Sequence, residues 1–166
     1  MRPSITLAEA YFDMCQDWIR NSENRYKYET IELAIERIKR ELNWEKGIDV
    51  PEDGVPSICY WFIDDANSII GTSRLRKTLN ERFKHFGGNI GYDVRPFYRM
   101  QGYGTIILKL TIEKAKESGL NKVLLTCDDD NIPSWKIIEH NNGKLENKEY
   151  NEETKKMMRR YWIHIE

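Results

Sequence analysis

The segment from Asn89 to Cys127 constrains the fold more than any other part of the chain. A short strand at 89–94 is followed by a glycine-bearing loop, a largely apolar helix at 103–118 and a continuous apolar run at 123–127. A helix that is apolar on several sides is mostly buried, and an uninterrupted apolar strand is typical of one covered on both faces. A strand, a helix and a buried strand in this order predict a parallel βαβ unit. The expected fold class is therefore α/β, of the α+β kind.

The flanking regions supply further helices and strands. The first helix is expected to begin at Thr6, with Glu9 three residues later in the arrangement of a capping box. The other expected elements are a helix at 31–46, a hairpin of strands at 57–63 and 68–75, a short helix at 134–140, and a closing antiparallel pair at 144–150 and 158–165. These elements follow from helical and alternating hydrophobic spacing.

Composition excludes several classes of protein. With 166 residues and 40% hydrophobic residues, the chain is expected to form one domain, 1–166, with a real core. A formal net charge of −1 gives no electrostatic case for nucleic-acid binding. We find neither an apolar stretch near the ~20 residues of a membrane helix nor the apolar run of a secretory signal, so we expect a cytoplasmic protein without a membrane partner. Scattered cysteines and histidines predict no metal site.

The loop at 95–105 carries the chemistry. Its sequence, RPFYRMQGYGT, places Gly102 and Gly104 at the start of the apolar helix, where successive N–H groups can point at one spot. Arg99 would add charge-assisted hydrogen bonds. The pattern favours a phosphate or pyrophosphate ligand, although it matches neither the triphosphate P-loop nor the three-glycine dinucleotide motif. Taken alone, a glycine-bearing turn at a helix start is the more frequent explanation.

In context, the sequence resembles the Gcn5-related N-acetyltransferase (GNAT) superfamily. Arg99, Gly102 and Gly104 match the family motif [Q/R]-x-x-G-x-[G/A], and residues 91–96 look like the family's fourth strand, whose end splays from its neighbour. Asn131 and Ser134 match the residues that precede the family's fourth helix. The likeness covers essentially the whole chain. It implies a three-layer fold with a mixed central sheet of about six to seven strands, helices on both faces, and a splayed parallel pair that holds coenzyme A.

The resemblance also implies acetyl-CoA as co-substrate, without a metal. The acetyl group would pass directly to a primary amine of a small molecule or peptide. We expect a monomer or homodimer, and the charge balance predicts no nucleic-acid partner. Loop amides would bind the pyrophosphate, and the splayed strand would hold the pantetheine arm. The implied contact residues are Tyr92, Val94, Arg99, Met100, Gln101, Gly102, Tyr103, Gly104, Thr105, Asn131 and Ser134.

Catalytic groups are less well defined. Asp93, the carboxylate nearest to the expected thioester, is the candidate base, with a local structural role as the alternative. The triplet Asp128–Asp130 could attract a cationic amine or be a solvated turn, and the basic run 74–84 is expected to be a solvated face. Many family members have a tyrosine acid where this chain has Ile138, which leaves the acid unassigned. A non-catalytic acyl-CoA-binding module, or an enzyme with another acyl donor, therefore stays open.

Overall fold

The computed structural model describes residues 1–23 and 25–165. The elements follow the predicted order, with one short additional helix, α3. The helices are α1 (Ala8–Arg20), α2 (Ile31–Glu45), α3 (Glu81–His85), α4 (Tyr103–Glu117) and α5 (Ile132–His140), with 3₁₀ turns at Ile5–Leu7 and Pro96–Tyr98. The strands are β1 (Ile58–Ile63), β2 (Ile69–Leu75), β3 (Ile90–Val94), β4 (Lys122–Asp128), β5 (Lys144–Asn151) and β6 (Lys156–His164).

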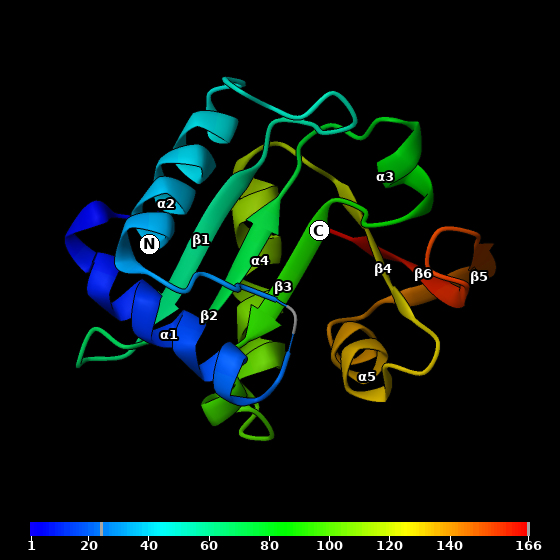
Figure 1. The fold of residues 1–166 in the computed structure, drawn as a ribbon. Helices are drawn as coiled ribbons and strands as arrows, with labels where there is room; N and C mark the ends of the chain where they lie inside the picture. Colours follow the sequence, from blue (N-terminus) through cyan, green and yellow to red (C-terminus); the bar gives the residue numbers. More distant parts are fainter. Residues whose placement is uncertain (24, 166) are drawn as a thin grey trace.

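Within the described residues, the strands form two antiparallel sheets of three strands each. Sheet A has the order β1-β2-β3, and sheet B has the order β4-β6-β5. β3 and β4 run in the same direction and meet near their first residues, where the Asn89 N–H donates to the Leu124 carbonyl oxygen (2.7 Å) and the Leu124 N–H donates to Asn89 Oδ1 (2.8 Å). Beyond this point they diverge (Figure 1). The predicted α/β class is confirmed, but the wide splay divides the expected mixed sheet into two separate ladders.

Helices cover both sides of this framework. α1 and α2 lie on one face of sheet A and α4 lies on the other (Figure 1). Under α1 and α2 the core is aromatic, and the rings of Tyr11 and Trp61 stack with centroids 4.8 Å apart. The second core joins α4 and α5 to both sheets through Leu108, Leu125 and Ile138. In the described part of the chain, no helix combines the length and apolar character needed to cross a membrane.

The predicted capping box at Thr6 and Glu9 is wrong. The chain turns earlier, in a 3₁₀ turn at Ile5–Leu7, and Ser4 caps this turn by accepting a hydrogen bond from the Thr6 N–H (3.3 Å). Thr6 then lies inside the turn and shares a hydroxyl hydrogen bond with Ser4 (2.7 Å between oxygens). α1 itself begins at Ala8 without a side-chain cap.

Candidate functional site

The splay between β3 and β4 exposes main-chain groups of β3. The N–H and C=O of one strand residue point to the same side, and the side alternates along the strand. Two hydrogen bonds at the ends of the β2–β3 ladder show which residues of β3 face β2: the Arg76 N–H donates to the Asn89 carbonyl oxygen (2.7 Å), and the Arg95 N–H donates to the Ile70 carbonyl oxygen (2.8 Å). Odd-numbered residues of β3 therefore face β2. The main-chain groups of Tyr92 and Val94 face the splay, where an extended ligand can pair with them as an additional strand.

A row of free amides lies at the end of the splay, where α4 begins. Gly102 is the N-cap of α4 and has a left-handed φ of +82°. Among described residues, the N–H groups from Met100 to Gly104 find no hydrogen-bond acceptor, whereas the Thr105 N–H donates to the Gly102 carbonyl oxygen (3.1 Å). The predicted amide site thus ends at Gly104. These donors and the positive end of the helix dipole form a site suited to an anion.

Gly104 places this row of amides beside the splay. A Cβ at Gly104 would lie 2.6 Å from Ile137 Cδ1 and 3.4 Å from Val94 Cγ2. The absence of a side chain lets the first turn of α4 approach both α5 and the end of β3. The loop prediction therefore has two separate physical bases: Gly102 supplies the left-handed turn, and Gly104 supplies the close approach.

Arg99 is already paired with another part of the chain. Its guanidinium lies over the Trp18 ring (4.7 Å to the centroid), and its Nη1 and Nη2 donate to the two carboxylate oxygens of Glu23 (2.6 and 3.0 Å). Its Nε donates to the Val94 carbonyl oxygen (3.2 Å). The Glu23 carboxylate is thus bound to the guanidinium that the resemblance assigns to the pyrophosphate, and no motif in the sequence marks Glu23 as a partner of Arg99.

Asp93 lies on the α1–α2 side of β3 and is mostly buried. Its Oδ2 accepts a hydrogen bond from the Tyr26 hydroxyl (2.8 Å) and pairs with Arg25 Nη2 (2.8 Å), while the Tyr26 hydroxyl also contacts Thr72 Oγ1 (2.8 Å). Burial raises the pKa of the Asp93 carboxyl, and Arg25 opposes that effect. The carboxylate thus anchors the loop between α1 and α2 to β3.

Tyr92 points to the opposite side of β3, toward α5. Its hydroxyl lies 3.1 Å from both the carbonyl oxygen and the side-chain Oγ of Ser134. Asn131 caps α5, because its Oδ1 accepts a hydrogen bond from the Ser134 N–H (3.2 Å). Ile138, one turn farther along α5, is fully buried. The predicted ligands Asn131 and Ser134 thus lie beside the splay, each with a partner inside the protein.

The acidic triplet at the end of β4 forms ion pairs with the hairpin of β5 and β6. The pairs, by nitrogen–oxygen distance, are Lys156 with Asp128 (2.8 Å) and Asp130 (3.2 Å), and Asp129 with Lys148 (2.9 Å) and Arg159 (2.5 Å). These ion pairs weaken the expectation that the triplet attracts a cationic amine. They instead tie the end of β4 to the hairpin.

The basic run 74–84 is also distributed among local partners. Its contacts are Arg74 with Glu41 (3.1 Å), Arg82 with Asp53 (2.9 Å), Lys84 with Glu81 (2.6 Å) and the Arg76 guanidinium over the Phe83 ring (4.2 Å to the centroid). Arg74 and Arg76 are half-buried in these contacts, so the run is not a simple solvated face. It does not form a concentrated patch for an anionic partner.

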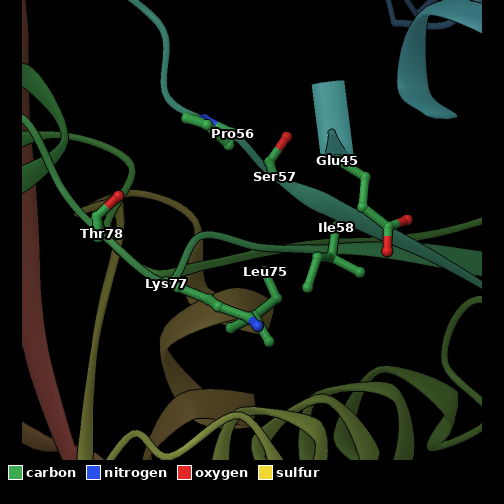
Figure 2. Close-up of a pocket in the computed structure, with 7 residues that line it drawn as sticks. All are labelled: Glu45, Pro56, Ser57, Ile58, Leu75, Lys77 and Thr78. Atoms are coloured by element: carbon green, nitrogen blue, oxygen red, sulfur yellow. The ribbon is translucent and has the colours of Figure 1, made fainter. Parts of the chain in front are cut away.

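Two hollows lie at sheet A, one far from the row of amides and one that reaches the first turn of α4 at Tyr103. One, of about 180 Å³, lies at the far end of sheet A, where β1 begins and β2 ends. Figure 2 shows its lining residues, including Glu45, whose carboxylate pairs with Arg2 (2.9 Å). The other, of about 480 Å³, is an apolar groove between β1 and the outer side of α4. Among described residues, no cluster of His, Cys, Asp and Glu has the arrangement of a metal site.

Comparisons with known proteins agree with this fold. The family model described as Acetyltransferase (GNAT) family matches residues 13–143. One similar solved structure is a putative ribosomal-protein-serine acetyltransferase from Vibrio cholerae, with 19% identity and a TM-score of 0.68 over 98% of this chain and 90% of that chain. Another is the microcin C7 self-immunity acetyltransferase MccE in complex with acetyl-CoA and AMP, with 15% identity and a TM-score of 0.76 over 99% of this chain and 91% of that chain. A third is an acetyltransferase from Salmonella typhimurium that modifies the N-terminal serine of ribosomal protein L7/L12, with 14% identity and a TM-score of 0.72 over 100% of this chain and 94% of that chain. Comparison with curated protein sequences gives no match.

At these low identities, the solved structures establish the fold alone. The family follows from the model match, which covers well over half of the chain and includes β3, the loop with Arg99, Gly102 and Gly104, and β4. The family predicted from the motif is therefore confirmed. The chain belongs to the GNAT family of acetyltransferases.

Proposed function

We propose that this acetyltransferase moves an acetyl group from acetyl-CoA directly to a primary amine of a small molecule or a peptide. The observation that carries the proposal is the row of free amides from Met100 to Gly104, which ends at a splay lined by unpaired main-chain groups of β3. A diphosphate and an extended, amide-bearing arm have the chemistry that these two features recognise. The similarity to MccE, solved with acetyl-CoA, supports this choice of donor.

The binding roles follow from the local geometry. The amides at the start of α4 would hold the pyrophosphate, and the free N–H and C=O groups of Tyr92, with the free N–H of Val94, would pair with the pantetheine arm, because the Val94 carbonyl oxygen already accepts a hydrogen bond from Arg99 Nε (3.2 Å). A main-chain N–H in the splay would also polarise the thioester carbonyl. Removal of one such donor typically lowers the rate by ~10²–10³. Asn131 and Ser134 border the arm from the side of α5.

The amine would approach from the side of α1 and α2, where Asp93 lies. Attack on the thioester carbon requires a neutral amine, so a base near this point increases the reactive fraction. Burial raises the pKa of Asp93, which makes it a better proton acceptor than an ordinary aspartate. Arg25 and Tyr26 hold the carboxylate in place (2.8 Å each). Direct transfer needs no acyl-enzyme intermediate.

A non-catalytic module that binds acyl-CoA is the second candidate. One observation favours it: Ile138 is fully buried and aliphatic, so α5 has no proton donor at that position. Such a module would use the same amides and the same splay. The two candidates therefore differ in turnover and not in coenzyme A binding.

The test measures free thiol released from acetyl-CoA by the purified protein. The amine panel contains peptides that begin with serine, nucleotides that carry an amine, and simple primary alkylamines, with mass spectrometry to identify the acetylated product. Thiol release that depends on an amine is expected and excludes the sensor. Binding of coenzyme A without amine-dependent release would favour the sensor, and absence of binding would refute both candidates.

A further inference from the structure

The proposed transfer leaves one proton without an assigned donor. As the C–N bond forms, the C–S bond breaks and the sulfur departs as a thiolate, which becomes a stable thiol only after it takes up a proton. Asp93 is on the opposite side of β3, and Ile138 has no proton to give. Two titratable side chains, Tyr92 and Cys127, contact Ser134 in the first turn of α5, beside the splay.

Tyr92 spans the splay. Its main-chain groups face the gap between β3 and β4, and its ring extends to the first turn of α5, the helix that follows β4. The hydroxyl ends 3.1 Å from the Ser134 carbonyl oxygen and 3.1 Å from Ser134 Oγ. The phenol thus closes the α5 side of the channel in which an extended arm would lie. The hydroxyl lies beside that channel without any rearrangement of the main chain.

The surroundings of Tyr92 keep its hydroxyl in the protonated form. Burial raises the pKa of the Tyr92 hydroxyl above its ordinary value, although Ser134 partly opposes the rise. The Ser134 hydroxyl can return a proton to the phenolate from solvent. Cys127 contacts the same serine, and burial raises the pKa of its thiol to about 11. Its side chain, however, belongs to β4, whereas Tyr92 belongs to the strand that would hold the thioester.

We propose that Tyr92 is the general acid of this enzyme and protonates the departing sulfur of coenzyme A. The inference rests on the proposed function. The phenol O–H bond breaks as the S–H bond forms, the attacking nitrogen loses one proton to Asp93 or to water, and the phenolate regains a proton through Ser134. The net products are the acetylated amine and free coenzyme A. The acid thus comes from the splayed strand rather than from α5.

The test compares two donors, acetyl-CoA and its selenoester analogue, with the best amine of the panel. A selenol is far more acidic than a thiol, so its anion leaves without a proton. Tyr92→Phe is expected to lower kcat with acetyl-CoA by ~10²-fold or more, to change the KM for acetyl-CoA by less than about threefold, and to regain a rate near the wild-type value with the selenoester. Tyr161→Phe is the matched control, because it removes another hydroxyl of the same core, bonded to Glu139 (2.9 Å).

Several outcomes would overturn the inference. An equal deficit of Tyr92→Phe with both donors would assign the residue a bracing role, and the absence of a deficit would remove it from the chemistry. A loss in Cys127→Ala that the selenoester restores would transfer the role to the cysteine. Thermal unfolding of each variant separates these results from a failure to fold. If wild-type protein is inert toward the whole panel, the proposed function fails and this inference fails with it, whereas active wild type with an equally active Tyr92→Phe refutes the inference alone.

Discussion

Gly102 and Gly119 stand at the two ends of α4 and offer a matched pair of substitutions. Their φ angles are +82° and +85°, and no atom lies within 4 Å of the position that a Cβ would occupy at either residue. Alanine at either site meets no neighbour, so the change in stability comes from the left-handed backbone alone, ~1–2 kcal/mol. In a chain of this size, a loss of 1 kcal/mol lowers Tm by ~2–4 °C. Both variants should therefore unfold ~2–8 °C below wild type.

The two variants should differ in coenzyme A binding. Gly102 lies within the row of free amides, and Gly119 lies at the other end of the helix. The open space at Gly102 is the approach that a pyrophosphate would use, and a methyl group there would hold the ligand away from the N–H donors. A hydrogen bond to a charged group contributes ~1.5–3 kcal/mol, and 1.4 kcal/mol is a factor of ten. Loss of one such bond should weaken binding ~10- to 100-fold, and Gly102→Glu should abolish it.

Titration calorimetry with coenzyme A measures the affinity, and thermal unfolding followed by circular dichroism measures stability on the same samples. The expected result is an equal fall in Tm for the two alanine variants and a fall in affinity for Gly102→Ala alone. Wild-type affinity in Gly102→Ala would refute the amide site. Equal losses of affinity in both variants would show that strain in α4, and not access to the amides, controls binding.

Three further predictions concern charged groups. Because burial raises the pKa of Asp93, the folded state binds this proton at a higher pH than the unfolded state does. The stability of wild type relative to Asp93→Asn should therefore increase as pH falls from 7 toward 4. Urea unfolding at several pH values measures this difference, and an increase toward high pH would contradict the prediction. Glu23→Gln should strengthen coenzyme A binding up to about fivefold at low salt, because it releases Arg99 from an exposed ion pair. Weaker binding in titration calorimetry would show instead that Glu23 positions the loop. Asp130→Asn should leave the KM of the amine within about twofold, because Lys156 already pairs with that carboxylate; a large rise in KM would restore its role in attracting the amine.

Backbone features of the site were predictable because they depend on local sequence. Gly102 and Gly104 indicated the tight turn and the helix start, and the apolar run at 123–127 indicated a buried strand beside it. The turn and the helix start depend on the two glycines, and the buried strand depends on a short run of apolar residues, so none of them requires knowledge of distant contacts. The structure differs in one detail: the last free amide of the loop is that of Gly104 and not that of Thr105.

Side-chain pairings across the chain were not predictable in the same way. Glu23 and Arg99 are 76 residues apart, and Asp93 lies 67 residues from Tyr26. Single-sequence patterns contain no signal for such partners, since any exposed acid could meet any base. The acidic triplet illustrates the consequence. Its sequence predicts a negative patch, but in the fold the cationic side chains of the β5–β6 hairpin pair with it.

These pairings join the two halves of the site through the loop between α1 and α2. On one side Glu23 binds Arg99 of the amide loop, and on the other Arg25 and Tyr26 bind Asp93 of β3. The first pair is exposed, with side chains 40% and 36% accessible, so it contributes ~0–1 kcal/mol. The Asp93 carboxylate is 13% accessible, and removal of its partners would leave a charge nearly buried without compensation. A pyrophosphate could therefore displace Glu23 from Arg99 at little cost while the loop stays anchored at Asp93.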